Sequence, residues 1–132
     1  MDTFQAGFAR VNITPKLGTP LSGYYQTRYA SSVLDELEAN AMAVSCGGRR
    51  AVVFSVDHLG LILPVQTEYR KHIAEVTGLP EEAIYIHCIH VHNGPVISLD
   101  GTDPMVEEYR LSLKEKLAQC AADALADLKP AK

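Results

Sequence analysis

Residues 51–90 have the sequence AVVFSVDHLGLILPVQTEYRKHIAEVTGLPEEAIYIHCIH, which predicts a strand, a helix and a second strand. The apolar run 51–56 is typical of a central strand covered on both faces. Pro64 suits the first turn of a helix over 63–77, and Gly78 ends that helix. A strand–helix–strand unit of this length makes its two strands parallel neighbours. We therefore expect an α/β fold organised around this unit.

Two further strands are expected before this unit. The first covers residues 4–13, where apolar residues alternate loosely. The second covers residues 38–46; a Gly-Gly hairpin signal joins it to residues 50–56, the first strand of the unit, so these two strands are expected to be antiparallel. The segment 15–23 contains two prolines and two glycines. This composition excludes regular structure and is typical of a loop that lines a site.

Two apolar stripes predict the helices that pack on the sheet. In the helix 63–77 the stripe consists of Val65, Tyr69, Ile73 and Val76. A longer helix begins at Asp103-Pro104, and its stripe consists of Val106, Tyr109, Leu113, Leu117, Cys120, Ala124 and Leu128. Charged residues such as Arg110 occupy its opposite side and are expected to be solvated. Together the elements predict a single α/β domain over residues 1–132, with a mixed sheet of about four strands, two main helices and a βαβ unit.

The composition of the 132-residue chain limits the classes of function. Its formal net charge of −4 includes no basic run, so we expect no nucleic-acid partner. No apolar segment approaches the roughly 20 residues of a membrane span. Residues 1–9 lack the basic and apolar regions of a secretion signal, so we expect a cytoplasmic protein. Cys46, Cys88 and Cys120 are widely spaced, as reduced and buried thiols are, and a disulfide framework or a Cys-type zinc site is not expected.

The segment 87–95, HCIHVHNGP, holds three of the five histidines and is the part of the chain most typical of chemistry. If the second strand extends over 83–92, His90 and His92 project from one face and His87 from the other. Two imidazoles about 7 Å apart along a strand can converge on one metal ion or one substrate group. We therefore predict that His90 and His92 are a functional pair and that His87 is a packed or surface residue.

Asp57 and His58 follow the neighbouring parallel strand. Because open α/β sheets bind ligands at the carboxyl ends of their strands, we expect these two residues beside His90 and His92. Each pair also has a structural interpretation that stays open. Asp57 and His58 could form a cap or turn at the end of the strand, and His90 and His92 could be hydrogen-bonded structural groups. Cys88 adjoins the histidines, and we expect a buried, inert thiol there in preference to an activated thiolate.

Residues 24–29, YYQTRY, place three tyrosines beside an arginine. This loop either packs on its own aromatic rings or contacts a substrate, and we predict the second role for Tyr24. No Gly-x-Ser-x-Gly elbow, dinucleotide fingerprint or phosphate-binding loop occurs in the sequence. Metal-dependent chemistry is therefore the better hypothesis.

Four motifs occur in the same order as in a known protein family. They are Gly7–Pro15 (GFARVNITP), Pro20–Tyr24 (PLSGY), Ala51–Asp57 (AVVFSVD) and Ile89–Pro95 (IHVHNGP). The chain thus resembles the N-terminal part of the neutral/alkaline, non-lysosomal ceramidase-like family. In that family the last motif usually has the sequence Thr-His-Thr-His-Ser-Gly-Pro. This chain differs from it at Ile89, Val91 and Asn93 and keeps both histidines, the glycine and the proline.

The resemblance implies a zinc-dependent amidase that cleaves the N-acyl bond of ceramide. It also implies that the zinc site is completed by a further His, a Glu and a Tyr beyond the matched region, because family members are several times longer. The resemblance gives His90 the role of a zinc ligand and places His92 beside it. Together with the residue pattern, it leads us to expect His92 or Asp57 in proton transfer, Tyr24, Asn93 and Gly94 at the substrate, and His58 as a further candidate.

The resemblance therefore predicts an incomplete version of a full enzyme, acting on a small-molecule or lipid amide. Helix faces that a longer relative would cover are then covered by another copy of the chain, which predicts a homo-oligomer. The alternative from a different class is a non-catalytic ligand-binding or oligomeric module with a vestigial metal site.

Overall fold

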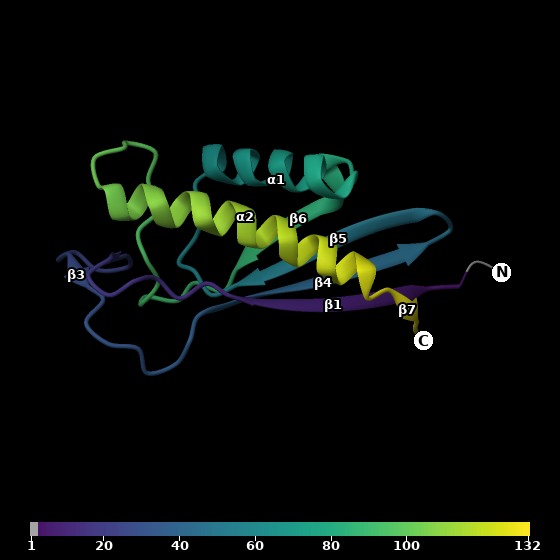
Figure 1. The fold of residues 1–132 in the computed structure, drawn as a ribbon, viewed down its shortest axis with the longest axis horizontal. Coiled ribbons are helices and arrows are strands. Elements are labelled where there is room, and N and C mark those ends of the chain that lie inside the picture. Colours follow the sequence, from purple (N-terminus) through teal and green to yellow (C-terminus); the bar gives the residue numbers. More distant parts are fainter. Residues whose placement is uncertain (1–2) are drawn as a thin grey trace.

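The computed structural model describes residues 3–132, which form a five-stranded sheet with two helices packed on it (Figure 1). The strands of this sheet are β1 (Gln5–Asn12), β4 (Glu38–Cys46), β5 (Arg49–Val56), β6 (Ile84–Cys88) and β7 (Lys129–Pro130). The other elements are the helices α1 (Leu63–Thr77) and α2 (Pro104–Ala126), the 3₁₀ turn η1 (Glu81–Ala83), and a small sheet of β2 (Pro20–Leu21) and β3 (Arg28–Tyr29). The predicted α/β fold is confirmed, with five strands in the main sheet where about four were expected.

The strand–helix–strand unit occupies one side of the sheet, whose order is β6-β5-β4-β1-β7. β5 and β6 are parallel, with Val52 opposite Ile84, as predicted. β4 and β5 are antiparallel, and between them Gly47 and Gly48 have φ angles of 58° and 75°. A two-residue type I′ turn requires positive φ at both positions, which explains the Gly-Gly pair. At the opposite edge β7 pairs with β1.

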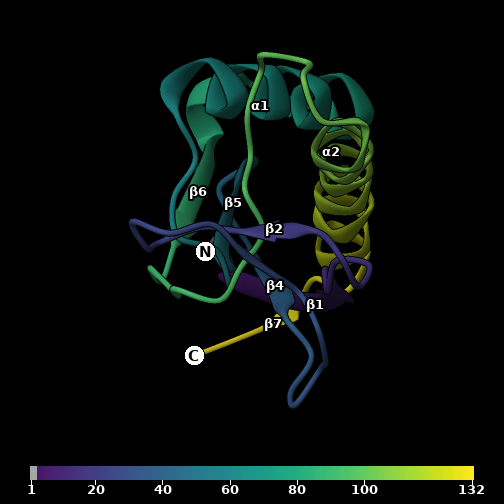
Figure 2. The same cartoon turned by 90° about the vertical axis from the view of Figure 1, so that its left-hand side faces the viewer.

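Both helices lie on the same face of the sheet (Figures 1 and 2). On this covered face Val52, Phe54 and Val56 of β5 are fully buried, whereas Val53 on the other face is 36% exposed. The prediction that β5 is covered on both faces is therefore wrong. An apolar run indicates that a strand is central, but it does not reveal whether the connecting helices pack on one face or on two.

The uncovered face carries a row of apolar side chains, one from each of four strands. The register places Phe8 opposite Met42, and it aligns Val53 with both Met42 and Tyr85. All four side chains are exposed. We refer to Phe8, Met42, Val53 and Tyr85 as the open-face row.

The bounds of α1 agree with the sequence prediction. Pro64 lies in the first turn, and Gly78 ends the helix with a φ of 71° and an N–H bond to the oxygen of Ala74 (2.8 Å). Of the predicted stripe, Val65, Tyr69 and Ile73 are buried, but Val76 is exposed because it lies in the last turn. Within residues 3–132, neither helix combines the length and the apolar character needed to cross a bilayer.

Arg110 of α2 is buried, so the prediction that it is solvated is wrong. Its side chain is 9% exposed and forms ion pairs with Glu107 (2.6 Å) and with Glu68 of α1. The hydroxyl of Tyr69 donates to the backbone oxygen of Arg110 (2.7 Å). These bonds join the two helices and give the buried guanidinium the partners that it requires. The helical period could not reveal them, because Glu68 belongs to the other helix.

The three cysteines are free thiols in different surroundings. Cys120 is buried and Cys88 is partly buried, but Cys46 is exposed at the end of β4, which corrects the expectation for that residue. Burial raises the pKa of Cys88 and of Cys120 to about 11. Cys88 is therefore a neutral thiol near pH 7, in agreement with the inert role expected of it.

Candidate functional site

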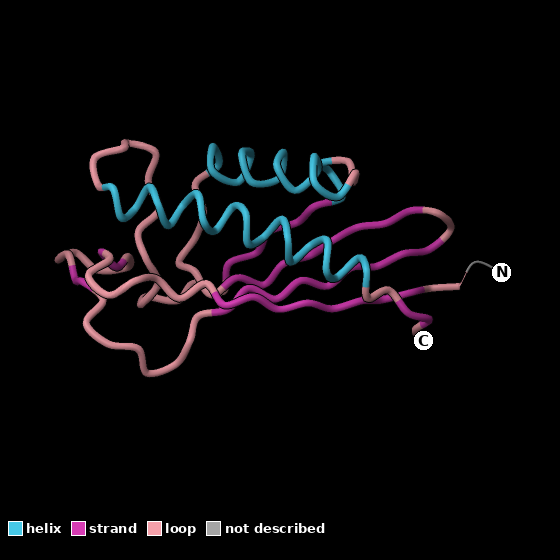
Figure 3. The backbone as a smooth tube through the Cα atoms, in the orientation of Figure 1, coloured by secondary structure: helices cyan, strands magenta, loops and turns pink. Residues whose placement is uncertain are grey.

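Loops gather at the end of the sheet where β5 and β6 finish, opposite the β4–β5 hairpin (Figure 3). The predicted site residues lie in these loops: Asp57 and His58 follow β5, the segment 90–94 follows β6, and Tyr24 lies between β2 and β3. Open α/β sheets bind ligands at this kind of edge.

The chain turns sharply at His90. β6 ends at Cys88, so the predicted continuation of the strand to His92 is wrong. His90 has a φ of 71°, in the left-handed region where a residue other than glycine stores roughly 1–3 kcal/mol of strain. Its N–H donates to the backbone oxygen of His58 (3.0 Å), which joins the turn to the end of β5. Strain of this kind persists where surrounding contacts hold it, and it is frequent at functional sites.

The turn brings the rings of His90 and His92 together, with centroids 4.9 Å apart and planes at 83°. The Nδ1 atom of His90 lies 2.8 Å from the oxygen of Leu59, and that of His92 lies 2.8 Å from the oxygen of Gly23. Because a carbonyl oxygen only accepts, we assign the proton of each ring to Nδ1, which leaves a lone pair on each Nε2. Backbone carbonyls orient metal-binding histidines in the same way.

Gly23 allows the backbone of the β2–β3 loop to approach His92. It has a φ of 100°, and a Cβ atom at this position would lie 2.7 Å from the Nδ1 atom of His92. The N–H and the hydroxyl of Ser22 donate to the oxygen of Gly94, at 2.9 and 3.2 Å. These bonds join two sequence motifs that are 72 residues apart. They follow directly on β2, where the expectation of no regular structure in residues 15–23 is wrong.

Tyr24 and Arg28 form the wall next to His92. The ring of Tyr24 meets the imidazole of His92 edge-on, with centroids 5.8 Å apart. The guanidinium of Arg28 lies 3.7 Å from the centroid of the Tyr24 ring, and its Nη2 atom donates to the oxygen of His92 (2.6 Å). Arg28 is a site residue that the sequence prediction missed. Its position among three tyrosines was the available signal, since guanidinium groups stack on aromatic faces.

Asp57 joins β5 to β4. Its Oδ2 atom accepts the N–H of Glu38 (2.9 Å), and its own N–H donates to the oxygen of Glu38 (2.9 Å). These hydrogen bonds cap the end of the strand, which is the structural interpretation that the sequence left open for Asp57. The role of Asp57 in proton transfer stays a prediction.

His58 is buried below the turn, with 1% of its surface exposed. Neither ring nitrogen has a hydrogen-bond partner within the described part of the chain. The ring stacks on that of Tyr109, with centroids 6.4 Å apart. Burial lowers the pKa of His58 to about 4, although the backbone of Gly60 raises it by a smaller amount. The ring is therefore neutral near pH 7. Its role as a further ligand stays a prediction.

The histidine pair offers two nitrogen donors to a metal ion. Zinc binds neutral imidazole, and catalytic zinc sites use three protein ligands. Within residues 3–132, no group of three or more His, Cys, Asp and Glu side chains is placed to hold a metal. The Nε2 atoms of His90 and His92 therefore fit zinc in donor type, and the role of His90 as a zinc ligand stays a prediction.

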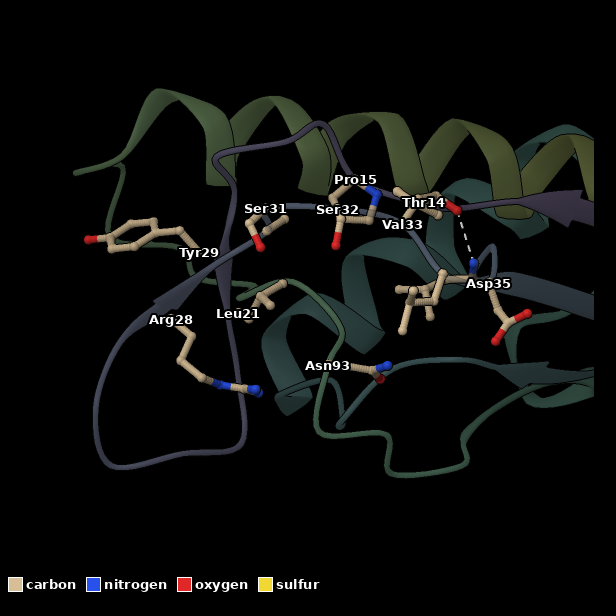
Figure 4. Close-up of a pocket in the computed structure, with 13 residues that line it drawn as sticks. Thr14, Pro15, Leu21, Arg28, Tyr29, Ser31, Ser32, Val33, Asp35 and Asn93 are labelled. Carbon is tan, nitrogen blue, oxygen red and sulfur yellow. Dashed lines mark hydrogen bonds between the residues drawn. The ribbon is translucent and has the colours of Figure 1, made fainter.

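A cavity of about 560 Å³ lies next to β2 and β3 (Figure 4). Arg28 and Asn93 line it where it meets the histidine motif. Of the residues predicted to bind substrate, Asn93 therefore faces this cavity, Tyr24 contacts His92, and Gly94 accepts the hydrogen bonds of the β2 segment.

Comparisons with known proteins bear on the fold. No family model and no curated protein matches the chain. Among solved structures, it is similar to neutral ceramidase from Pseudomonas aeruginosa, with 18% sequence identity and a TM-score of 0.81, covering 98% of this chain and 22% of that one. It is also similar to a ceramidase complexed with C2, with 18% identity, a TM-score of 0.78 and the same coverage. The chain therefore has a ceramidase-like fold and spans 22% of the length of these structures.

Proposed function

We propose that the chain is a ceramidase-like domain that contributes a histidine pair to the zinc site of an N-acyl amide hydrolase. The observation that carries this proposal is the pair of His90 and His92, whose rings lie together and are each oriented by a backbone carbonyl. The fold shared with two ceramidase structures supports it.

Each histidine has a separate role in this proposal. His90 presents its Nε2 atom to zinc, which when bound supplies Lewis-acid activation of an amide carbonyl and of water. The bonds of His90 to Leu59 and His58 hold its ring in the turn. His92, anchored to Gly23, accepts a proton from the attacking water or adds a second nitrogen ligand. Both roles use the neutral imidazole, in which a proton on Nδ1 leaves the lone pair on Nε2.

The substrate side of the site is formed by Tyr24, Asn93 and Gly94. Asn93 offers both a donor and an acceptor, which complement the N–H and C=O of an amide. The ring of Tyr24 contacts His92 and bounds the histidine pair on that side. The backbone oxygen of Gly94 accepts the hydrogen bonds of Ser22, which hold this segment against the β2 segment.

A non-catalytic module is the second candidate function. The observation that favours it is that the ligand set within residues 3–132 stops at two histidines. In this alternative the pair binds a metal or a ligand without turnover.

Zinc titration of the 132-residue chain tests the role of the pair. We expect His90→Ala to weaken zinc binding by more than the ~10–100-fold that follows loss of an outer-shell partner. The matched control is His87→Ala, which removes an exposed histidine of β6. Competition with a chelator of known affinity measures both. Parent affinity in His90→Ala would show that the zinc ligand lies elsewhere.

Hydrolysis separates the two candidate functions. A hydrolase releases a carboxylate and an amine from an N-acyl amide, and a chelator abolishes this release. Chelator-sensitive hydrolysis by the chain that is lost in His90→Ala contradicts the non-catalytic module.

A further inference from the structure

The cavity next to β2 and β3 has the size of a small-molecule site. Its volume of about 560 Å³ lies within the roughly 300–1,000 Å³ of ligand pockets. It is bounded by Thr14 and Pro15 after β1 and by the segment 30–37 before β4. Arg28 lines the cavity and donates to the backbone oxygen of His92, and Asn93, which also lines it, follows His92 in the chain. The cavity therefore adjoins the histidine motif through these two residues.

One wall of the cavity is apolar and open to solvent. Leu21, Val33, Leu34 and Leu37 line it, and Leu34 is 95% exposed. An apolar ligand that covers these side chains gains about 25 cal/mol for each Å² removed from water. An aliphatic chain is therefore a suitable occupant of this wall.

The charged end of the cavity is fixed by Arg28. Its Nη2 atom is bonded to His92, and its guanidinium rests on the ring of Tyr24. Within residues 3–132 its other nitrogens make no hydrogen bond, and Figure 4 shows the guanidinium extending toward Asn93. The acidic residue of the cavity, Asp35, lies at the far side in the same view. The end next to the histidines is thus cationic and the far end is anionic.

We propose that this cavity binds an acyl chain that bears a carboxylate. The carboxylate bonds to Arg28 and Asn93, and the chain covers Leu21, Val33 and Leu37. A guanidinium held flat by an aromatic ring presents its planar donors to a carboxylate with little loss of side-chain freedom. A neutral or cationic head group would lack this partner.

Two sources supply such a ligand, and the link to catalysis rests on the proposed function. Hydrolysis breaks the amide C–N bond and forms a C–O bond to water, so that RCONHR′ and H₂O give RCOO⁻ and R′NH₃⁺. The fatty carboxylate is then the product. In the other case R′ itself carries the carboxylate, and the ligand is an N-acyl amino acid substrate.

Titration of the metal-free chain, with chelator present and below the micellar concentration, tests the proposal. The probes are dodecanoate, N-dodecanoylglycine and dodecanol. We expect both carboxylates to bind at least about tenfold more tightly than dodecanol, since a charge-assisted hydrogen bond contributes roughly 1.5–3 kcal/mol. Arg28→Gln should remove this preference, and Arg50→Gln, at an exposed arginine outside the cavity, should keep it.

A second variant tests the apolar wall without touching the arginine. Val33→Asp should weaken dodecanoate binding, even if Arg28→Gln also disturbs the loop. The proposal is overturned if dodecanol binds as tightly as dodecanoate, or if both variants bind dodecanoate as the parent does. Tighter binding of N-dodecanoylglycine identifies the substrate as the source, and tighter binding of dodecanoate identifies the product.

These measurements are independent of the proposed function because they need neither zinc nor turnover. Carboxylate binding that depends on Arg28, in a chain whose zinc affinity is unchanged in His90→Ala, contradicts the proposed function alone. Amide hydrolysis without such binding contradicts the inference alone.

Discussion

The two faces of the five-stranded sheet have opposite surroundings, although the same strands supply both. Phe54, beneath α1 and α2, is fully buried, whereas Phe8 in the open-face row is 63% exposed. The hydrophobic stabilisation of the fold therefore comes from one face of the sheet, where the helices remove apolar side chains from water. The loops at the carboxyl ends of β5 and β6 lie at the end of this framework, where the turn at His90 can carry strain that the core compensates.

Truncation of one phenylalanine on each face gives the largest expected contrast. We expect Phe54→Ala to lower the free energy of unfolding by about 3–5 kcal/mol, because it removes buried contacts and leaves a cavity. We expect Phe8→Ala to cost less than about 1 kcal/mol, because the side chain is already largely in water. Urea unfolding of both variants and the parent at low protein concentration measures the two values.

The comparison of the faces fails if the two losses are equal. That outcome would mean that the open face is covered in solution as closely as the helical face. The slope of each unfolding curve serves as the control, since a changed slope would indicate a variant that no longer unfolds in two states.

His58 lies on the covered side, at the strand end that meets the site, and makes stability depend on pH. Burial lowers its pKa from 6.5 to about 4. Between these values the unfolded chain binds the proton that the folded chain excludes. The stability that the neutral, buried His58 ring gives to the folded chain is therefore fully present above pH 6.5 and is lost as the pH falls through 4. From pH 7 to pH 4 it amounts to about 3 kcal/mol, at 1.36 kcal/mol for each pKa unit.

Substitution of His58 isolates this effect from the titration of the carboxylates. In His58→Phe, which keeps an aromatic ring against Tyr109, we expect the loss of stability between pH 7 and pH 4 to be smaller than in the parent by about 3 kcal/mol. Unfolding curves of the zinc-free chain at each pH provide the measurement. His87→Phe, which keeps His58, serves as the control. Equal losses in His58→Phe and the parent would show that the buried ring is not the source.

The framework could be predicted from sequence because its signals are local. Pro64 and Gly78 bound α1 through the backbone conformations that they favour, and the Gly-Gly pair sets the hairpin between β4 and β5. The errors concern partners that come from distant parts of the chain. Arg110 is buried because Glu68 faces it from α1, and Val53 is exposed because α1 and α2 pack on one face.

The candidate site shows the same division. The strand expected over 83–92 predicted that His90 and His92 share a face; β6 ends at Cys88, yet the two rings lie 4.9 Å apart. The means of convergence was not predictable, because it depends on a left-handed turn and on the oxygen of Gly23 from a remote loop. Arg28 was missed for this reason as well, since its partner in the site is the backbone of His92.

The smallest expected effect on stability is at the centre of the open-face row. Met42→Gln exchanges an exposed thioether for an amide of similar length, so we expect the unfolding free energy of the single chain to change by about 0.5 kcal/mol or less. The sequence also predicted a homo-oligomer, in which a second copy covers apolar surface. Association would make the parent more stable as protein concentration rises, because binding to the folded state shifts the unfolding equilibrium. If that concentration dependence occurs and Met42→Gln abolishes it, the open-face row is an interface between copies, and the contrast between the two faces holds only for the isolated chain.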